Sequence, residues 1–111
     1  NFGEGIADFC FVAELENKIV GAAWSRIMND YGHIDDKTPS IALSVLKIFR
    51  RQGIATALMK NLIKKLSDEK FHQISLSVQK NNFAAIKLYE KLNFKIFRED
   101  ETEYIMILKL N

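Results

Sequence analysis

The stretch Leu43 to Ala57, L-S-V-L-K-I-F-R-R-Q-G-I-A-T-A, decides the fold, because it joins an extended apolar run to a helical pattern through an arginine-bearing turn. That turn, Arg50 to Ala55, has the pattern R-x-x-G-x-A. The first N–H groups of a helix have no intrahelical partner and carry partial positive charge. Gly53 has no Cβ to hold a ligand away from the backbone. This order of strand, glycine turn and helix predicts a site for a phosphate group.

The composition is typical of one small globular domain. The chain has 111 residues, of which 48% are hydrophobic and 27% charged, so we expect residues 1–111 to form a single domain. The apolar runs are too short for a membrane helix and no secretory signal pattern opens the chain, so we expect a cytoplasmic protein with no membrane partner. The net charge of +2 and the lack of a reading motif give no support to nucleic-acid binding.

Few residues could bind a soft metal or form a disulfide. Cys10 is the single cysteine, and His33 and His72 are the only histidines. An intrachain disulfide therefore cannot form, and these side chains are too few for a structural zinc site, so we expect no metal. The chain begins at Asn1 rather than at methionine, and we expect that preceding sequence is missing.

The remaining elements follow from the spacing of apolar residues. A hairpin comes first, and a loop around the single proline separates it from the strand that enters the arginine turn. Apolar residues recur every fourth position after Gly53, which predicts an amphipathic helix. The expected strands are Phe9–Glu16, Ile19–Met28, Ile41–Ile48, Phe71–Gln79, Phe94–Arg98 and Glu103–Leu110, and the expected helices are Gly53–Ser67 and Phe83–Leu92.

This order of elements determines the fold class. A strand–helix–strand step needs a crossover between parallel strands, whereas the hairpins at both ends of the chain are antiparallel. We therefore expect an α/β (α+β) fold with a mixed, mostly antiparallel central sheet flanked by helices. Asn81 and Asn82 are good N-cap residues for the second helix, and Asn93 suits a left-handed position at its end.

Cationic residues gather in and after the arginine turn. Two readings of this pattern stay open: a surface that attracts an anion, or the solvated face of an amphipathic helix. The residues concerned are Lys47, Arg50, Arg51, Lys60, Lys64 and Lys65.

Three motifs follow one another on the expected elements: R-x-x-G-x-A at Arg50–Ala55, N-x-x-A-I-x-L-Y at Asn82–Tyr89, and Y-E-K-L-N-F at Tyr89–Phe94. In this order and spacing they resemble the GNAT superfamily of N-acetyltransferases, which transfer an acyl group from acyl-coenzyme A to an amine. The resemblance covers the chain from about Phe9 to its end. It implies the acyl-CoA N-acyltransferase fold without the family's first strand and two helices, which in relatives form one wall of the acceptor groove.

The resemblance implies acetyl-CoA as co-substrate. The strand before the arginine turn would pair with the pantetheine arm, and the turn would cradle the pyrophosphate, with Arg50 and Arg51 adding charge-assisted contacts. Asn82 would contact the pantetheine region, cap its helix, or do both. Tyr89 would act as catalytic acid toward the departing thiolate. The implied coenzyme-binding residues are Leu43, Ser44, Val45, Arg50, Arg51, Gln52, Gly53, Ile54, Ala55, Thr56, Asn82 and Tyr89.

The general base is where this sequence departs from the family pattern. Many relatives carry a glutamate five residues before the motif asparagine, where this chain has Ser77, and others carry an acid near Pro39 or Ser40. At pH 7 a lysine-type amine of pKa about 10.4 costs roughly 4–5 kcal/mol to deprotonate, and an α-amine near 8 costs little more than about 1. Water, an acceptor of low pKa, or a loop residue would therefore have to serve. The loop candidates are His33, Asp35 and Asp36.

Three functions are consistent with these patterns. The first is transfer of an acetyl group from acetyl-CoA to a primary amine of a small molecule or protein. The second is a non-catalytic module that binds acyl-CoA or a partner protein, which the missing acids favour. The third is a nucleotide-binding domain, although the chain has neither G-x-x-x-x-G-K-[ST] nor G-x-G-x-x-G. The resemblance also implies that homodimers can form.

Overall fold

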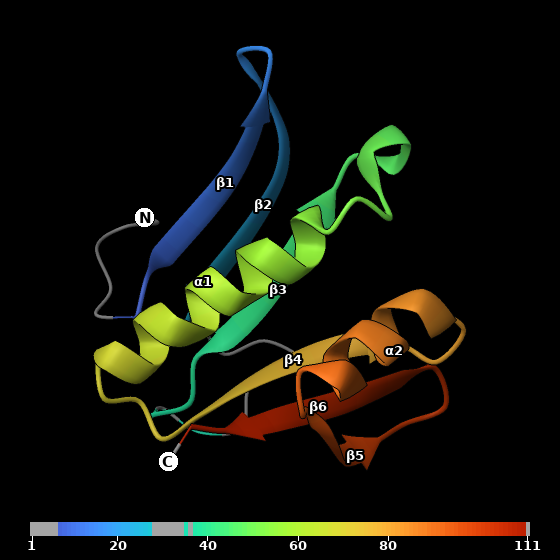
Figure 1. Cartoon of the computed structure of the whole chain (residues 1–111). Coiled ribbons are helices and arrows are strands. Elements are labelled where there is room, and N and C mark those ends of the chain that lie inside the picture. Colours follow the sequence, from blue (N-terminus) through green and yellow to red (C-terminus); the bar gives the residue numbers. More distant parts are fainter. Residues whose placement is uncertain (1–6, 28–34, 36, 111) are drawn as a thin grey trace.

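The computed structural model describes residues 7–27, 35 and 37–110, which form one six-stranded sheet with helices packed against it (Figure 1). In chain order the elements are β1 (Phe9–Leu15), β2 (Lys18–Arg26), β3 (Ser40–Val45), the 3₁₀ turn η1 (Lys47–Phe49), α1 (Ile54–Asp68), β4 (Gln73–Gln79), α2 (Phe83–Lys91), β5 (Lys95–Glu99) and β6 (Glu103–Lys109).

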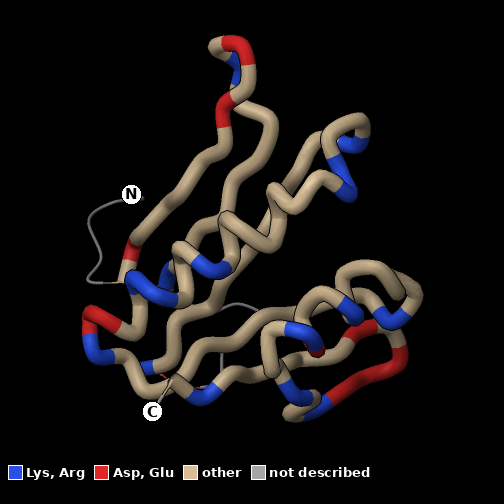
Figure 2. Tube along the Cα trace, viewed as in Figure 1, with Lys and Arg blue, Asp and Glu red and all other residues tan. Residues whose placement is uncertain are grey.

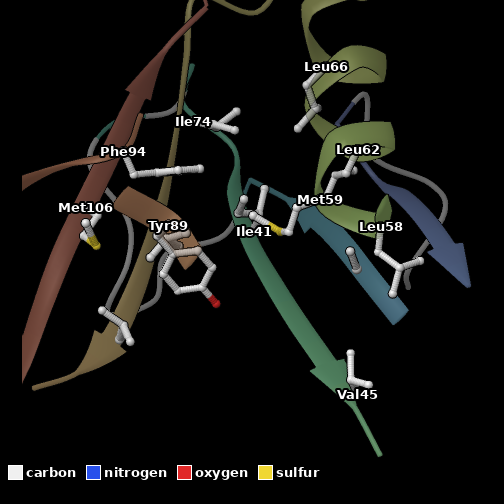
Figure 3. Packing of buried hydrophobic residues seen from close by; sticks show 13 residues of the cluster. Ile41, Val45, Leu58, Met59, Leu62, Leu66, Ile74, Tyr89, Phe94 and Met106 are labelled. Carbon is white, nitrogen blue, oxygen red and sulfur yellow. The ribbon is translucent and has the colours of Figure 1, made fainter. Parts of the chain in front are cut away.

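The sheet has the strand order β1-β2-β3-β4-β6-β5. Its neighbouring strands are antiparallel except for the parallel pair β3 and β4. This arrangement confirms the expected mixed, mostly antiparallel sheet. Met59 of α1 and Tyr89 of α2 belong to the same buried cluster as Met106 of β6, so both helices cover one face of the sheet (Figure 3). The opposite face carries residues of the other strand parity, Ser77 among them.

β3 and β4 are joined only at their beginnings. Their register consists of one pair, Ser40 with Ser75, and the Ser75 N–H donates to the Pro39 carbonyl at 3.0 Å. Beyond this pair the two strands diverge (Figure 1). β3 therefore leaves one edge without a partner strand over Leu43–Val45, and β4 leaves one over Ser77–Gln79.

Two of the strand ends that differ from the prediction are explained by turns. The β1–β2 hairpin turns at Glu16 and Asn17, whose φ values are 52° and 65°, because a two-residue turn with both φ positive matches the twist of the strands. β3 ends at Val45 rather than Ile48. The Leu46 carbonyl accepts the Phe49 N–H at 2.9 Å, so this stretch forms η1 instead of continuing the strand. Met28 and most of the predicted loop before β3 lie outside the described residues.

Both helices end in the same hydrogen-bonded motif. After α1, Lys70 is left-handed (φ 71°) and the Phe71 N–H donates to the Leu66 carbonyl at 3.1 Å, which is the Schellman pattern. Because this bond holds Phe71 at the end of the helix, β4 begins later than predicted, at Gln73. After α2 the left-handed residue is Asn93 (φ 76°), as the sequence predicted.

Candidate functional site

The arginine turn leaves the N-terminus of α1 without a side-chain cap. Gly53 is the N-cap residue and adopts the left-handed conformation at φ 79°. No side chain hydrogen-bonds to the first turn, and that turn contains no acidic residue. The first intrahelical bond runs from the Ala57 N–H to the Gly53 carbonyl at 3.0 Å. The N–H groups of the first turn and the helix dipole are thus left for an anionic ligand.

The two arginines of the turn have different environments. The Arg50 Nε donates to the Val45 carbonyl at 3.2 Å, which ties the turn to the end of β3. Arg51 is exposed and holds a left-handed backbone at φ 66°. A residue other than glycine pays roughly 1–2 kcal/mol for that conformation. Arg50 therefore fixes the shape of the turn with one N–H group, while the Arg51 side chain extends from a strained backbone.

A pocket of about 700 Å³ lies between this turn and α2, which is within the usual range for small-molecule sites. It brings together most of the residues that the sequence singled out, from three separate elements. Gln52 and Ile54 are not among its lining residues; Gln52 is exposed and Ile54 packs against the core. The lining residues are Leu43, Ser44, Val45, Lys47, Phe49, Arg50, Arg51, Gly53, Ala55, Thr56, Asn82, Ala84, Ala85, Leu88 and Tyr89.

Sequence reasoning missed five of these lining residues. Lys47, predicted only as a cation near the turn, lies in the expected strand Ile41–Ile48, and Phe49 directly follows it, so the sequence did not indicate the 3₁₀ turn that brings both to the pocket. Ala85 and Leu88 were quoted only as motif letters, although they share one face of α2 with Tyr89 at helical spacing. That spacing was the available signal. The five residues are Lys47, Phe49, Ala84, Ala85 and Leu88.

Five of the six cations predicted near the turn fall into two groups, and the sixth, Lys60, is exposed on α1. Lys47, Arg50 and Arg51 line the pocket. Lys64 and Lys65 instead pair with acids one helical turn later on α1, at 2.9 Å and 3.3 Å. Figure 2 shows both groups on the trace. The reading as a solvated helix face thus applies to the α1 pairs, and the reading as an anion-attracting surface stays a prediction for the turn.

The unpartnered edge of β3 lines the pocket with backbone groups. The Leu46 N–H bonds to Val20 of β2 at 2.8 Å, and hydrogen-bonding direction alternates along a strand. The N–H and C=O groups of Leu43 and Val45 therefore point away from β2, toward the gap beside β4. An extended ligand lying in that gap would meet backbone donors and acceptors at strand spacing.

Asn82 is the N-cap of α2. Its Oδ1 accepts the Ala85 N–H at 3.2 Å, which is the ordinary capping contact. The residue also lines the pocket. The capping bond occupies the amide oxygen and leaves the amide N–H₂ group as the donor that a ligand could meet.

Tyr89 projects from α2 and is 8% exposed. Burial raises the pKa of its phenol, so the hydroxyl stays protonated at neutral pH. Its ring centroid lies 5.9 Å from that of Phe94, with the planes inclined by 59°. Figure 3 shows the Tyr89 hydroxyl directed away from Phe94. The residue thus presents a protonated O–H at the wall of the pocket, which can donate a proton or a hydrogen bond.

The described structure has no acid at Pro39, Ser40 or Ser77, the strand positions at which relatives carry the general base. Ser77 is exposed on β4 and Pro39 is buried before β3. The Asp35 Oδ1 accepts the Lys37 N–H at 2.8 Å, so this carboxylate caps a local turn. His33 and Asp36 lie outside the described residues.

Residues 7–27, 35 and 37–110 contain neither a metal-binding cluster nor a membrane-spanning helix. Within these ranges no group of three or more Cys, His, Asp or Glu side chains is arranged to hold a metal ion. Over the same ranges, neither α1 nor α2 combines the length and the apolar character needed to cross a bilayer.

An open pocket beside parted parallel strands, with an uncapped helix N-terminus at one end, defines the acyl-CoA N-acyltransferase fold. The acetyltransferase (GNAT) family model matches residues 3–94. The chain belongs to this family.

Similar proteins agree with that assignment. The chain is 34% identical to the N-alpha-acetyltransferase of Saccharolobus solfataricus over 86% of this chain and 66% of that protein. It therefore spans about two thirds of the length of that relative. The N-acetyltransferase of Staphylococcus aureus Mu50 superposes with a TM-score of 0.82 at 23% identity, covering 94% and 68% of the two chains. PaiA N-acetyltransferase from Thermoplasma acidophilum, solved with coenzyme A, gives 0.79 at 17% identity, covering 93% and 61%.

Proposed function

We propose that this protein is an acetyl-CoA-dependent N-acetyltransferase. The observation that carries the proposal is the joint position of the uncapped α1 N-terminus and the Tyr89 phenol on one pocket. The first can hold a pyrophosphate and the second can protonate a thiolate, and an acyl-coenzyme A carries both a pyrophosphate and a thioester. Family membership and a neighbouring fold solved with coenzyme A support the same donor.

Each part of the pocket has a role in this proposal. The backbone groups of Leu43 and Val45 pair with the amides of the pantetheine arm. The N–H groups from Gly53 to Thr56 bind the pyrophosphate, and Arg51 adds charge to that contact. The Asn82 amide N–H₂ group donates to the pantetheine region. Tyr89 stands beside the thioester sulfur.

The proposed reaction balances without a redox partner. A protonated acceptor amine first loses one proton to a base. The neutral nitrogen then attacks the thioester carbonyl carbon, forming a C–N bond. The C–S bond breaks, and the coenzyme thiolate receives a proton from Tyr89, which regains one from the former amine nitrogen. The products are an N-acetyl amide, the coenzyme thiol and one proton released to solvent.

We propose an α-amine as the acceptor class. The name of the Saccharolobus relative specifies such an amine, and the physical chemistry favours it. An α-amine near pKa 8 loses its proton at neutral pH for about 1 kcal/mol, against roughly 4–5 kcal/mol for a lysine ε-amine. A site with Ser77 where relatives carry a glutamate handles the first acceptor more easily.

The test is thiol release from acetyl-CoA by the protein in its full natural length. The acceptors are peptides with an unblocked N-terminus, peptides with a blocked N-terminus and one lysine, and small amines. Turnover with the first set at more than tenfold the rate of the second is expected. Tight coenzyme binding by calorimetry with no turnover on any amine would instead identify a non-catalytic module. Binding of nucleotides but not of coenzyme A would exclude both readings.

We also propose that the enzyme works in the cytoplasm and can form homodimers. A single cysteine supports the location, because a reducing compartment does not call for disulfides. Fluorescence of a tagged copy tests the location, and sedimentation of the full-length protein tests the dimer.

A further inference from the structure

The coenzyme pocket lies on the side of the sheet that carries α1 and α2, because the lining residues include Ala55 of α1 and Leu88 of α2. A bound coenzyme would fill the gap between β3 and β4 from this side. The acceptor must then reach the thioester from the opposite face. On the basis of the proposed function, a residue on that opposite face receives the acceptor's proton.

Strand register places Glu103 on the opposite face, near Ser77. β4 and β6 pair Ser77 with Ile105 and Gln79 with Glu103. Residues directly paired across a sheet share a face, and so do residues two apart on one strand. Ser77, Gln79 and Glu103 therefore project from the same face, which is the face away from the helices. Ser77 and Gln79 are exposed and Glu103 is half-buried.

Along the strands, Glu103 stands level with the part of β3 assigned to the pantetheine arm, and Ser77 lies two residues nearer the closed end of the gap. The parallel pair Ser40–Ser75 puts Ser44 of β3 level with Gln79 of β4, and Gln79 is the direct partner of Glu103. The part of β3 assigned to the pantetheine arm is thus level with this carboxylate. Diagonal neighbours across antiparallel strands lie about 7–8 Å apart, which a long side chain can bridge. A single water held between the Ser77 hydroxyl and the Glu103 carboxylate would span the rest.

Two neighbouring acids, Asp100 and Glu99, are engaged in other contacts. The Asp100 Oδ1 accepts the N–H groups of Thr102 and Glu103, each at 2.8 Å. These two bonds hold the pKa of Asp100 below its usual value, so this carboxylate works as the cap of the β5–β6 turn. Glu99 pairs with Lys80 at 3.1 Å, and its register partner Tyr104 belongs to the helix-covered face.

The backbone of Glu103 is held in place by the same turn. Its N–H donates to the Asp100 carboxylate, and its carbonyl accepts the Asp100 N–H at 3.0 Å. Three charged side chains share its face from β5 and the turn, namely Lys95 and Arg98, which pair with Ile107 and Ile105, and Asp100. Glu103 is therefore a carboxylate on a fixed strand position, between the turn and the gap.

We propose that Glu103 is the general base of the reaction and acts through a water molecule held at Ser77. The acceptor's ammonium group gives one proton to this water, which passes one to the Glu103 carboxylate. The amine is left neutral for attack, and the carboxylic acid returns its proton to solvent after turnover. The acid that relatives place on β4 is thus supplied by the next strand, β6.

The experiment compares Glu103→Gln with the full-length wild type in kcat/KM for an α-amine peptide from pH 6 to 9.5. Loss of a general base typically costs 10²–10⁴-fold, and with a water able to act directly we expect about 10²-fold at pH 7. The deficit should shrink to under about tenfold at pH 9, because the α-amine deprotonates by itself near pH 8. Coenzyme A affinity, measured by calorimetry, should stay within about twofold.

Two further variants make the result specific. Glu101→Gln, an exposed acid in the same turn, should behave like the wild type at every pH. Ser77→Glu in the Glu103→Gln background places a carboxylate beside the gap and should recover at least about tenfold of the lost activity. A pH-independent loss, unimpaired turnover of Glu103→Gln, or a double variant without recovery overturns the role of Glu103. A wild type without turnover on any amine overturns the proposed function as well.

Discussion

The rings of Tyr89 and Phe94 lie 5.9 Å apart because both residues belong to the motif that ends α2. The Phe94 N–H donates to the Tyr89 carbonyl at 3.0 Å, across the left-handed Asn93. A hydrophobic contact between these two positions commonly accompanies a Schellman motif. The helix end thus fixes the direction of the phenol, and β5 starts directly after it.

Tyr89→Phe should separate chemistry from binding. The variant keeps the ring and its contact with Phe94, and it removes only the O–H. We expect kcat to fall by about 10- to 100-fold while the Kd for coenzyme A changes by less than about twofold. Rapid-mix kinetics and calorimetry measure the two quantities. Equal losses in both would assign Tyr89 to structure instead.

The same variant should change the stability of the protein at alkaline pH. Burial raises the pKa of Tyr89 in the folded state, so above the ordinary value of about 10 the unfolded chain releases a proton that the folded chain keeps. The wild type therefore loses stability as the pH rises from about 10 toward the folded pKa. Tyr89→Phe should flatten this decline in urea titrations between pH 9 and 11. An unchanged slope would contradict the assignment.

Phe94→Ala should impair both the core and the site. Phe94 is 3% exposed, and removing a buried phenylalanine ring costs about 3–5 kcal/mol. We expect a large fall in the urea midpoint, together with a kcat loss at low temperature where the protein remains folded. Phe94→Leu keeps most of the volume and should recover most of the stability. If Phe94→Leu also keeps full kcat, the aromatic contact does not orient Tyr89.

Substitutions at Gly53 distinguish the cost of a strained backbone from the loss of access for the ligand. No atom lies within 4 Å of a Cβ added there, so the space is open, but φ is +79°. Gly53→Ala should lower the free energy of unfolding by about 1–2 kcal/mol. Gly53→Asn tolerates the left-handed conformation better and should retain more stability. Both should weaken coenzyme A binding, since each puts a Cβ where the ligand approaches. Tight binding by Gly53→Asn would show that the pyrophosphate lies elsewhere.

The two arginines of the turn should give different profiles when changed to alanine. Arg51→Ala should weaken coenzyme A binding by about tenfold at low salt, since charge-assisted hydrogen bonds contribute about 1.5–3 kcal/mol, and the effect should diminish as salt is added. Arg50→Ala should lower the thermal midpoint as well, because it also removes the tie to Val45. Lys64→Ala removes an exposed pair on α1 and serves as the control with unchanged affinity.

The sequence predicted the order of the elements and most of the pocket. Two repeating patterns made this possible, the helical spacing after Gly53 and the alternation around Leu76. In addition, the capping residue Asn82 marked the start of α2. The predicted end of β3 was wrong, because Ile48 continues the apolar character of the strand and only the hydrogen bond from the Phe49 N–H to the Leu46 carbonyl shows a 3₁₀ conformation. Glu103 was unreachable by motif reasoning, because its nearness to Ser77 depends on the register of β4 with β6.

The single rung between β3 and β4, at Ser40 and Ser75, has a mechanical consequence. It divides the sheet into two halves, β1-β2-β3 under α1 and β4-β6-β5 beside α2, which are joined at one end only. A ligand lying in the gap between β3 and β4 would connect the two halves with hydrogen bonds that the chain itself does not make. When coenzyme A binds, hydrogen exchange at Leu43 and Val45 should then slow. In the bound state the two halves of the sheet should unfold together rather than one after the other.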